Sequence, residues 1–498
     1  MLWNRNRLQH LAKASLGGRK LIVVSCRSPY SFEKRDGHLV PTTPAGGLTA
    51  ALKPVMEVTG GVWIAQSSDQ HPSPRIDLSG FSLRTLLIPN ELSKGHYEGL
   101  SNRALWPLCH NAYYRPEFRP SDWEAYRRVN EIFAEAVLQE AGGEPATVFV
   151  QDYHFALLPR LLKAANPALT VGQFWHIPFP HPEIAQLFPW LPELLDGMLG
   201  NDLLGFHVPS HSRNFQESVQ HSLAAYVEQA HDTIWYRSSP TQLRAVPVSI
   251  DFQQHSQLAA STQTERYMRE WAARLGPASF IGLGIDRLDY TKGIPDRIRA
   301  LSALFEANPA LRGKLTFVQV GVPSRTALVP YAELGRETDA EVQAINHKWG
   351  TDRWTPVLFE KRSLGPCEMM ALHRLSRFCM VTPLHDGMNL VAKEFVASRA
   401  DLDGVLILSR FAGAAQELGA ALLVNPFNPS ELSSAILTAL AMERPERRAR
   451  MAAARAVVRE NNVFRWAGAL LQELAAIASL PASGAYQGYP MTLSAGVA

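Results

Sequence analysis

Short apolar runs alternate with amphipathic stretches along almost the whole chain. Runs of this length are typical of strands buried on both faces of a parallel sheet, and the amphipathic stretches are typical of the helices that connect such strands. In the first half of the chain the expected strands are Leu21–Ser25, Leu83–Ile88, Thr147–Gln151, Val171–Trp175 and Leu203–Val208. The pattern therefore predicts an α/β fold.

A second series of strands follows an apolar run at Val246–Asp251 and the polar stretch QQHSQLAASTQTER, which together form the expected hinge between two domains. The strands expected beyond it are Phe280–Ile285, Leu315–Val320, Val357–Glu360, Phe378–Thr382, Val405–Ser409 and Ala421–Val424, with helices such as Asn389–Ser398 and Glu431–Ala441 between them. We therefore expect two doubly wound, Rossmann-like domains facing each other across a cleft, with ligands at the carboxyl ends of the strands.

The length of 498 residues supports this division, since one hydrophobic core rarely serves more than about 250–300 residues. We expect a basic N-terminal extension over residues 1–20, a first domain over 21–250 and a second over 251–465. A C-terminal helix and a disordered tail are expected over 466–498, because residues 483–498 carry no charge and are rich in Gly, Ser and Ala.

The charge balance argues against some classes of partner. With 49 Lys and Arg against 46 Asp and Glu, the net charge of +3 is too small for a general polyanion binder, so nucleic acid is not an expected partner. No apolar stretch approaches the roughly 20 residues of a membrane span, and no secretory signal is expected. The four cysteines form no Cys-x-x-Cys pair, which favours a reducing, cytoplasmic location.

The first 20 residues carry five basic residues and no acid, and three leucines in them are spaced loosely like one face of a helix. Two interpretations stay open. One is a helix that meets a membrane surface or a partner. The other, which we favour, is a partly ordered extension before the first strand.

Two segments have the features of anion-binding loops. Arg27 follows the first expected strand, and Gly46-Gly47 opens a helix whose N-terminus would favour negative charge. In the second domain the first strand ends in DRLDYTKG, which places Arg287 and Lys292 on a loop where they could grip a diphosphate. Each signal alone is weak, because basic loop residues are usually just solvated.

The segment HDGMNLVAKEF is more specific. The amides of Met388, Asn389 and Leu390 would begin a helix and point at a phosphate. Glu394, four residues after Leu390, lies on the same helical face and could accept hydrogen bonds from vicinal ribose hydroxyls.

Two further candidates follow strands of the first domain. Asp152 comes after the strand that ends at Gln151, and His176 after the one that ends at Trp175. Both therefore lie where ligand-contacting residues of such sheets belong. No pair of His, Asp or Glu residues here has the spacing of a metal site on one element, so no metal is expected.

Taken together, six blocks resemble the trehalose-6-phosphate synthase family of retaining GT-B glycosyltransferases, from about Leu21 to about Arg459. They are SNRALWP, QDYH, HIPFP, RLDYTKG, VPSR and DGMNLVAKE, in the order and with spacing similar to those of the family. The resemblance implies the GT-B fold.

The resemblance also implies a role for each matched position. The residues implied to act on the transferred glucose and the leaving diphosphate are Arg287, Lys292, His176 and Asp386. The remaining donor-binding residues would be Gly47, Met388, Asn389, Leu390 and Glu394. The acceptor pocket would be formed by Arg27, Tyr97, Trp106, Asp152 and Arg325, with the two arginines holding the acceptor phosphate.

The implied reaction transfers glucose from a nucleotide sugar, with UDP-glucose favoured, to glucose 6-phosphate with retention of configuration, giving α,α-trehalose 6-phosphate. It resembles a front-face displacement in which the leaving diphosphate takes the proton of the acceptor. No protein nucleophile, metal or other cofactor is expected. The partners would be small-molecule substrates, with a homo-oligomer left open.

The sequence departs from the family pattern at several positions. Cys26, Gln151 and His385 replace the usual Asn, His and Arg, and Gln66 stands where many members have a Trp that lines the acceptor site. Gln66 leaves open a synthase with another phosphorylated acceptor, such as glycerol 3-phosphate, although Arg325 favours a hexose phosphate. A non-catalytic regulatory subunit is disfavoured, because Arg287, Lys292, Asp386 and Glu394 are all present.

Overall fold

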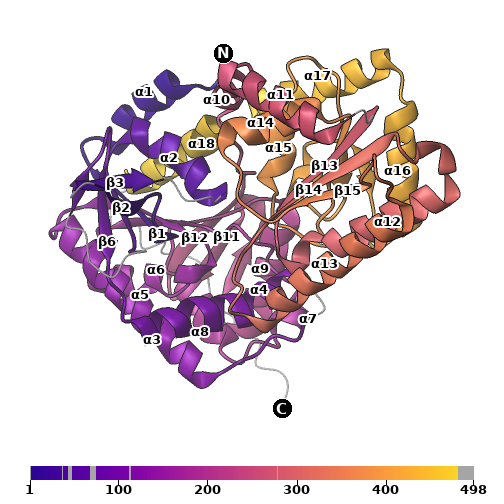
Figure 1. The fold of residues 1–498 in the computed structure, drawn as a ribbon. Coiled ribbons are helices and arrows are strands. Elements are labelled where there is room, and N and C mark those ends of the chain that lie inside the picture. The colour runs from indigo at the N-terminus through magenta and orange to yellow at the C-terminus, as the bar shows by residue number, and fades with distance from the viewer. Residues whose placement is uncertain are drawn as a thin grey trace.

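Two separate, mainly parallel sheets organise the chain, which the computed structural model describes at residues 2–35, 38–42, 47–67, 75–111, 114–276 and 279–479 (Figure 1). Within these residues one sheet has ten strands and the other six, and a hairpin of β2 (Ser31–Arg35) and β3 (His38–Thr42) pairs with neither. The predicted fold class, α/β with two doubly wound domains, is confirmed. The tail expected at 483–498 lies outside the described residues.

The ten-stranded sheet has a parallel centre with antiparallel strands at its edges. In spatial order the parallel strands are β12 (Ser239–Ala245), β9 (Leu203–Phe206), β8 (Thr170–Phe174), β7 (Ala146–Gln151), β1 (Lys20–Arg27), β4 (Val62–Gln66) and β6 (Ser82–Leu86). The edges are β10 (Tyr226–Glu228) with β11 (Thr233–Tyr236), and β5 (Ile76–Asp77). The strand order reverses between β1 and β7, and this reversal is the point where doubly wound sheets bind ligands.

The six-stranded sheet is wholly parallel. Its spatial order is β15 (Val357–Glu360), β14 (Leu315–Val322), β13 (Phe280–Arg287), β16 (Phe378–Val381), β17 (Val405–Ser409) and β18 (Leu422–Val424). This is the 3-2-1-4-5-6 order of a Rossmann sheet, with the reversal between β13 and β16.

All eleven strands expected from apolar runs lie on observed strands, with ends that differ by up to two residues. The prediction was incomplete at β4, whose Val62–Ala65 stretch is buried and carries the same signal as its neighbours. It was also incomplete at β12, which is half-buried near a sheet edge and therefore has polar residues at alternate positions.

Helices connect the strands. In the first domain they are α2 (Gly47–Thr59), α3 (Asn90–Ser93), a π-helix (Lys94–Leu105), α4 (Trp106–His110), α5 (Pro120–Ala141), α6 (Leu158–Ala165), α7 (Pro182–Ala185), α8 (Leu191–Met198) and α9 (Pro209–Ser222). In the second they are α10 (Phe252–Ala259), α11 (Thr262–Leu275), α12 (Ile294–Ala307), α13 (Val329–Trp349), α14 (Pro366–Leu375), α15 (Leu390–Ser398), α16 (Pro429–Ala441) and α17 (Arg444–Glu460). No helix in the described ranges is long and apolar enough to cross a bilayer.

The basic N-terminal segment is ordered, so the interpretation we favoured for it is wrong over residues 5–16. These residues form α1 (Arg5–Leu16), with Asn4 as a hydrogen-bonded N-cap and Gly17 in the left-handed conformation that commonly ends helices. Leu8 and Ala12 are buried, and α1 packs on α2 and on the last helix, α18 (Val463–Ala478). The leucine spacing therefore marks an intramolecular contact.

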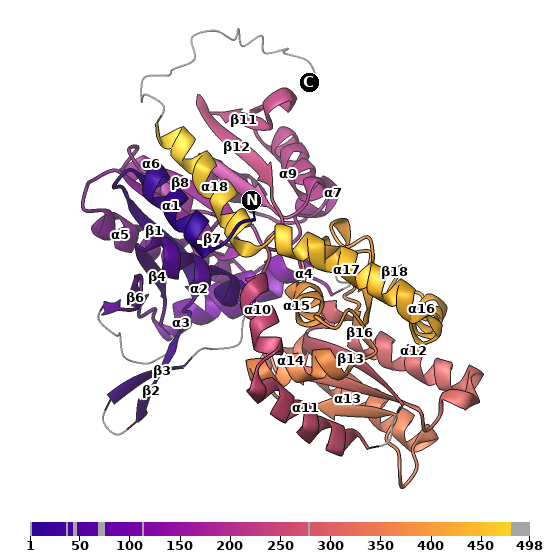
Figure 2. The same ribbon diagram turned by 90° about the horizontal axis from the view of Figure 1, so that it is seen from above.

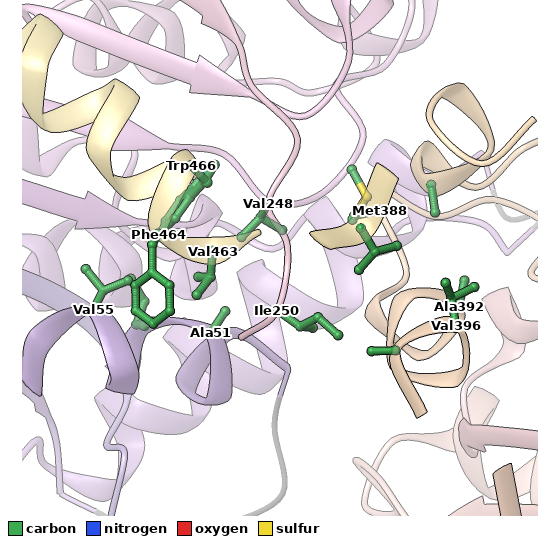
Figure 3. Close-up of a cluster of buried hydrophobic side chains, with 14 of the residues drawn as sticks. Ala51, Val55, Val248, Ile250, Met388, Ala392, Val396, Val463, Phe464 and Trp466 are labelled. Carbon is green, nitrogen blue, oxygen red and sulfur yellow. The ribbon is translucent and has the colours of Figure 1, made fainter. Parts of the chain in front are cut away.

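The chain crosses between the domains twice. The first crossover is the segment 246–251 after β12, and the second passes through Asn461 and Asn462 into α18. The two crossovers touch, because the amide of Val463 donates to the carbonyl of Ile250 at 3.0 Å. After the second crossover α18 returns to the first domain and packs beside α1, α2 and β8 (Figure 2). Apolar side chains from both domains surround these crossovers (Figure 3).

Candidate active site

The predicted site residues gather at the two points where strand order reverses. Arg27 ends β1 and Asp152 follows β7 in the first domain. Arg287 ends β13, and Asp386 lies in the loop between β16 and α15 in the second. The carboxyl ends of the two sheets face each other, because groups on these loops contact one another across the domain boundary, as follows.

A buried carboxylate, Asp289, is the centre of the contacts between the domains. Arg325 approaches its Oδ2 at 3.3 Å and Arg287 at 3.7 Å, both from the second domain. From the first domain the indole of Trp106 donates to Asp289 Oδ1 at 3.4 Å. Burial alone would raise the pKa of Asp289, but Arg287, Arg325 and Lys292 hold it below its usual value.

Trp106 lies against both guanidinium groups. The Cζ of Arg325 is 4.3 Å from the centroid of the Trp106 ring, and that of Arg287 is 5.4 Å away. Such cation–π contacts orient planar guanidinium groups. Trp106 thus joins the candidate acceptor and donor sites.

Arg325 is held in a strained and incompletely satisfied state. Its φ is +50°, a left-handed conformation that non-glycine residues adopt at a cost of about 1–3 kcal/mol when the surroundings enforce it. Its Nη1 donates to the hydroxyl of Tyr331 at 2.7 Å, and its buried Nε has no hydrogen-bond partner within the described chain. A buried guanidinium with a free donor is well suited to receive an anionic ligand.

Arg27 and Arg325 converge on Tyr97, which lies in the π-helix. Arg27 Nη2 donates to the Tyr97 hydroxyl. Burial would raise the pKa of this phenol, but Arg325 and Arg27 together lower it. The two arginines assigned to the acceptor phosphate, one from each domain, are therefore close enough to act on one group.

The loop before α15 is tied to the loop after β13. Lys292 Nζ donates to Asp386 Oδ2 at 2.5 Å, and Asn389 Nδ2 reaches the same oxygen at 3.1 Å. Lys292 and its hydrogen bonds lower the pKa of Asp386 against the effect of burial. Asn389 has a φ of +75° and a buried Oδ1 without a partner in the described chain. The loop before α15 is thus held through Asp386, and no side chain caps the first amides of the helix.

The remaining donor candidates lie around the first turn of α15. Met388 is buried, and Glu394 is half-buried one turn after Leu390, with a pKa that burial raises. Gly47, the first residue of α2, faces Leu390 across the domain boundary: a Cβ there would lie 3.5 Å from Leu390 Cδ1. Gly46 lies outside the described residues.

Gly387 lies close against the backbone of the first domain. A Cβ at this position would lie 2.3 Å from the carbonyl oxygen of His176, far inside any real contact. Nearby, His385 Nδ1 lies 3.0 Å from the carbonyl oxygen of His110. Glycine at 387 therefore lets the backbone of the second domain touch the backbone beside the candidate glucose site.

Replacing Gly387 with alanine is expected to lower kcat by about 10²-fold with little change in melting temperature, because a displacement of about 1 Å at a reacting centre costs that much and domain opening relieves the clash. Gly419→Ala is the matched control, since a Cβ there meets nothing within 4 Å. Steady-state kinetics and thermal denaturation measure both quantities. Wild-type turnover in Gly387→Ala would contradict this assignment.

Asp152 and His176 share a hydrogen-bond network after β7 and β8. Asp152 has a φ of +72° and its Oδ1 accepts from the amides of Tyr153 at 3.0 Å and His176 at 3.1 Å. Burial nevertheless raises the pKa of Asp152 to about 7. The Nε2 of His176 lies 3.0 Å from Gln151 Oε1, and burial lowers the pKa of His176 to about 3. His176 is therefore neutral, with Nε2–H donating to Gln151 and Nδ1 left to accept.

The raised pKa of Asp152 predicts a pH dependence of acceptor use. Below pH 7 the carboxyl is protonated and cannot accept from an acceptor hydroxyl as an anion, so kcat/KM for the acceptor should rise as pH increases through about 7 and then level off. A sugar phosphate itself titrates near a pKa of about 6. The profile of Asp152→Asn isolates the residue, because only the inflection near 7 should disappear. An unchanged profile in this variant would contradict the prediction.

Asp289 and Tyr331 were missed by the sequence analysis. Asp289 lies inside RLDYTKG, between two residues that were singled out, so the motif itself carried the signal. Tyr331, in α13, belongs to none of the six motif blocks. Gln66, the departure that left the acceptor open, lies in register with Arg27 and donates to Ser93 Oγ at 2.6 Å.

No cluster of three or more His, Cys, Asp or Glu side chains that could hold a metal occurs among the residues with described positions.

A hollow of about 390 Å³ lies at the other end of the first sheet, beside the start of β1, β4 and β6. It contains none of the predicted site residues.

Two doubly wound sheets with facing reversal points, a helix N-terminus beside a Lys and an Arg, and a separate pair of arginines define a nucleotide-sugar glycosyltransferase of the GT-B class. The comparisons specify the family. A model described as glycosyltransferase family 20 matches residues 19–476, so the chain belongs to that family.

A curated trehalose-6-phosphate synthase from Mycobacterium sp. (strain KMS) is 38% identical over 469 residues, which are 92% of this chain and 96% of the relative. A solved UDP-forming α,α-trehalose-phosphate synthase from Burkholderia xenovorans, in complex with glucose-6-phosphate, is 31% identical with a TM-score of 0.85, over 91% of this chain and 99% of that one. A structure from E. coli bound with UDP-2-fluoro glucose is 29% identical with a TM-score of 0.83, over 92% and 99%. The resemblance that the six blocks indicated is confirmed.

Proposed function

We propose that the chain transfers glucose from UDP-glucose to glucose 6-phosphate with retention, releasing α,α-trehalose 6-phosphate and UDP. The observation that carries the proposal is the presence of two separate anion-binding arrangements. One consists of Arg287, Lys292 and the first amides of α15, which suit a diphosphate. The other consists of Arg27 and Arg325, which both act on the Tyr97 hydroxyl and suit a monophosphate.

In this proposal the two substrates lie side by side between the domains, and each substrate is held by residues of both domains. Glu394 accepts from the ribose hydroxyls, and Asp386 and His176 hold hydroxyls of the transferred glucose. The neutral His176 accepts at Nδ1 because its Nε2 is already engaged by Gln151. Trp106 and Asp152 complete the acceptor site, and Trp106 also contacts Arg287 on the donor side. Relatives solved with glucose-6-phosphate and with UDP-2-fluoro glucose support this pair of substrates.

The proposed chemistry needs no protein nucleophile. The bond from glucose C1 to the diphosphate oxygen breaks, and the acceptor hydroxyl forms a bond to C1 on the same face. Its proton passes to the departing diphosphate, whose growing charge Arg287 and Lys292 stabilise. Exclusion of water depends on the contact between the domains at Gly387 and His176.

We expect turnover to survive excess chelator, because two cationic side chains and helix amides supply the positive charge that a divalent ion would otherwise provide. UDP release measured with and without chelator checks this. Loss of activity in chelator that one divalent ion restores would contradict it.

A panel of nucleotide-glucose donors crossed with phosphorylated acceptors tests the proposal, with nucleoside diphosphate release as the rate and NMR of the product as the readout of anomeric configuration. UDP-glucose with glucose 6-phosphate should give the highest kcat/KM and an α,α linkage. The second candidate acceptor is glycerol 3-phosphate, favoured by Gln66 at the end of β4. Preference for glycerol 3-phosphate, or inversion at C1, would overturn the proposal.

We also propose a cytoplasmic location, which accords with four free cysteines, Cys26, Cys109, Cys367 and Cys379. The proposed partners are the small-molecule substrates, and a homo-oligomer stays a hypothesis.

A further inference from the structure

The first crossover contains a residue, Val248, whose backbone N–H contacts the first domain and whose backbone C=O contacts the second. The amide of Val248 points at His207 Nδ1, 3.4 Å away in the first domain. Its carbonyl accepts from Lys393 Nζ at 2.9 Å, from α15 in the second domain. Val248 and both side chains are buried, with 4%, 2% and 1% of their surfaces exposed. A hinge residue that would otherwise be free to rotate is therefore fixed from two sides.

His207 connects the backbone of Val248 to the candidate glucose site. Since a backbone amide can only donate, Nδ1 of His207 accepts, and its proton is therefore on Nε2. Nε2–H then donates to the carbonyl of His176 at 3.0 Å. That is the carbonyl against which Gly387 packs when the domains meet.

Lys393 connects the backbone of Val248 to the candidate donor site and to the second crossover. It directly precedes Glu394 and lies one turn after Leu390, whose amide is assigned to the diphosphate. Its ammonium also pairs with Glu417 Oε2 at 2.5 Å. The other oxygen, Glu417 Oε1, accepts from Asn461 Nδ2 at 3.1 Å, and Asn461 lies in the second crossover. One lysine thus links α15 to both hinge segments.

The surroundings make these bonds strong and directional. Val248, Ile250, Met388 and Val463 belong to one buried apolar cluster that spans the two domains (Figure 3). In such an environment a hydrogen bond is stronger than in water, and an unpaired polar group is costly. The bonds therefore break only when the geometry of the hinge changes.

We propose that His207 and Lys393 are positioning residues that couple occupation of the donor site to the angle between the domains. They act through the backbone N–H and C=O groups of Val248. A donor bound at the start of α15 would draw that helix toward it, and Lys393 would transmit the shift to the hinge. His207 would align the His176 backbone with the same hinge position. The inference rests on the proposed function, because it requires a nucleotide at α15.

Two changes, made separately and together, test the proposed coupling between the donor site and the hinge. The first is Lys393→Met with Glu417→Gln, which removes the lysine without leaving a buried charge and keeps an acceptor for Asn461. The second is His207→Phe, which keeps the ring packing on Phe174, 5.0 Å between centroids, but removes both hydrogen bonds. The probe is UDP, with its Kd measured by calorimetry and the radius of gyration measured by small-angle scattering with and without UDP.

Each change should raise the Kd for UDP by at least about fivefold and abolish the compaction that UDP causes in the wild type. When the two changes are combined, the fold-increase in Kd should be smaller than the product of the two single fold-increases, since both changes act on the backbone of Val248. The matched control is Lys163→Met with Asp202→Asn. Lys163 also joins a carboxylate and a backbone carbonyl, at 3.0 Å from Asp202 Oδ1 and from the Leu169 oxygen, but away from the hinge. This control variant should be less stable than the wild type but should bind UDP with the same Kd.

Wild-type Kd and compaction in the variants, or effects that multiply fully, would overturn the inference. If the lysine variant does not fold, His207→Phe alone decides, because it involves no buried charge. Wild-type protein that fails to transfer glucose sinks the proposed function instead, whereas active wild type with unaffected variants sinks only the hinge inference.

Discussion

Replacing Arg287 with alanine should lower kcat by about 10²- to 10³-fold, because the guanidinium is assigned to the diphosphate whose charge grows as the bond to glucose breaks. The fold should persist. Asp289 keeps Arg325, the indole of Trp106 and the Thr291 amide as partners when Arg287 is removed.

Single-turnover and steady-state rates measure the effect, and circular dichroism and thermal denaturation check the fold. Arg127→Ala is the matched control: this arginine has a similar exposed fraction, 37% against 33%, and lies on α5 with Glu193 as its partner. Arg287→Lys should recover part of the rate, since it keeps charge but lacks the fork. Near-normal kcat in a folded Arg287→Ala protein would remove the residue from the mechanism.

The second large effect concerns Arg325. Its replacement by alanine should raise the KM for glucose 6-phosphate about ten- to hundredfold, which corresponds to the loss of about 1.5–3 kcal/mol from a charge-assisted hydrogen bond. Donor Kd and slow donor hydrolysis should change much less, because Arg325 belongs to the acceptor side of Trp106 and Tyr97.

Tyr331→Phe separates charge from orientation in this experiment. It removes the hydroxyl that accepts from Arg325 Nη1 at 2.7 Å but leaves the guanidinium in place, so the KM should rise less than in Arg325→Ala. Equal effects would mean that orientation alone matters. An unchanged KM for glucose 6-phosphate in a folded Arg325→Ala protein would contradict the acceptor assignment.

Much of the fold and site could be predicted because both depend on local signals. β14 and β17 are mostly apolar and almost fully buried, since a parallel sheet buries both faces, and the observed strands contain the expected ones. Arg27, Asp152 and Arg287 end or follow such strands, and strand ends at the reversal points are adjacent by topology. The proximity of Arg27 and Asp152, which lie at one sheet, follows from the strand pattern, whereas that of Arg287, at the other sheet, depends on how the domains meet.

What could not be predicted depends on how the two domains meet. No pattern in the sequence indicates that Gly387 touches the carbonyl of His176, or that Trp106 shares Asp289 with Arg325. The packing of α1 could not be predicted for the same reason. Its basic surface is visible in the sequence, but the helices that bury Leu8 and Ala12 lie far away along the chain.

The return of α18 to the first domain determines the order in which the chain can fold as it is synthesised. Trp466 in α18 packs on Phe149 and Phe174 of the first sheet, with ring centroids 5.9 and 5.1 Å apart. The first domain therefore stays incomplete until the whole second domain has left the ribosome, whereas residues 252–460 need no later segment to close their own sheet. A gene chimera that exchanges only residues 252–460 between relatives would transplant the proposed donor module whole and leave both parts of the first domain from one parent.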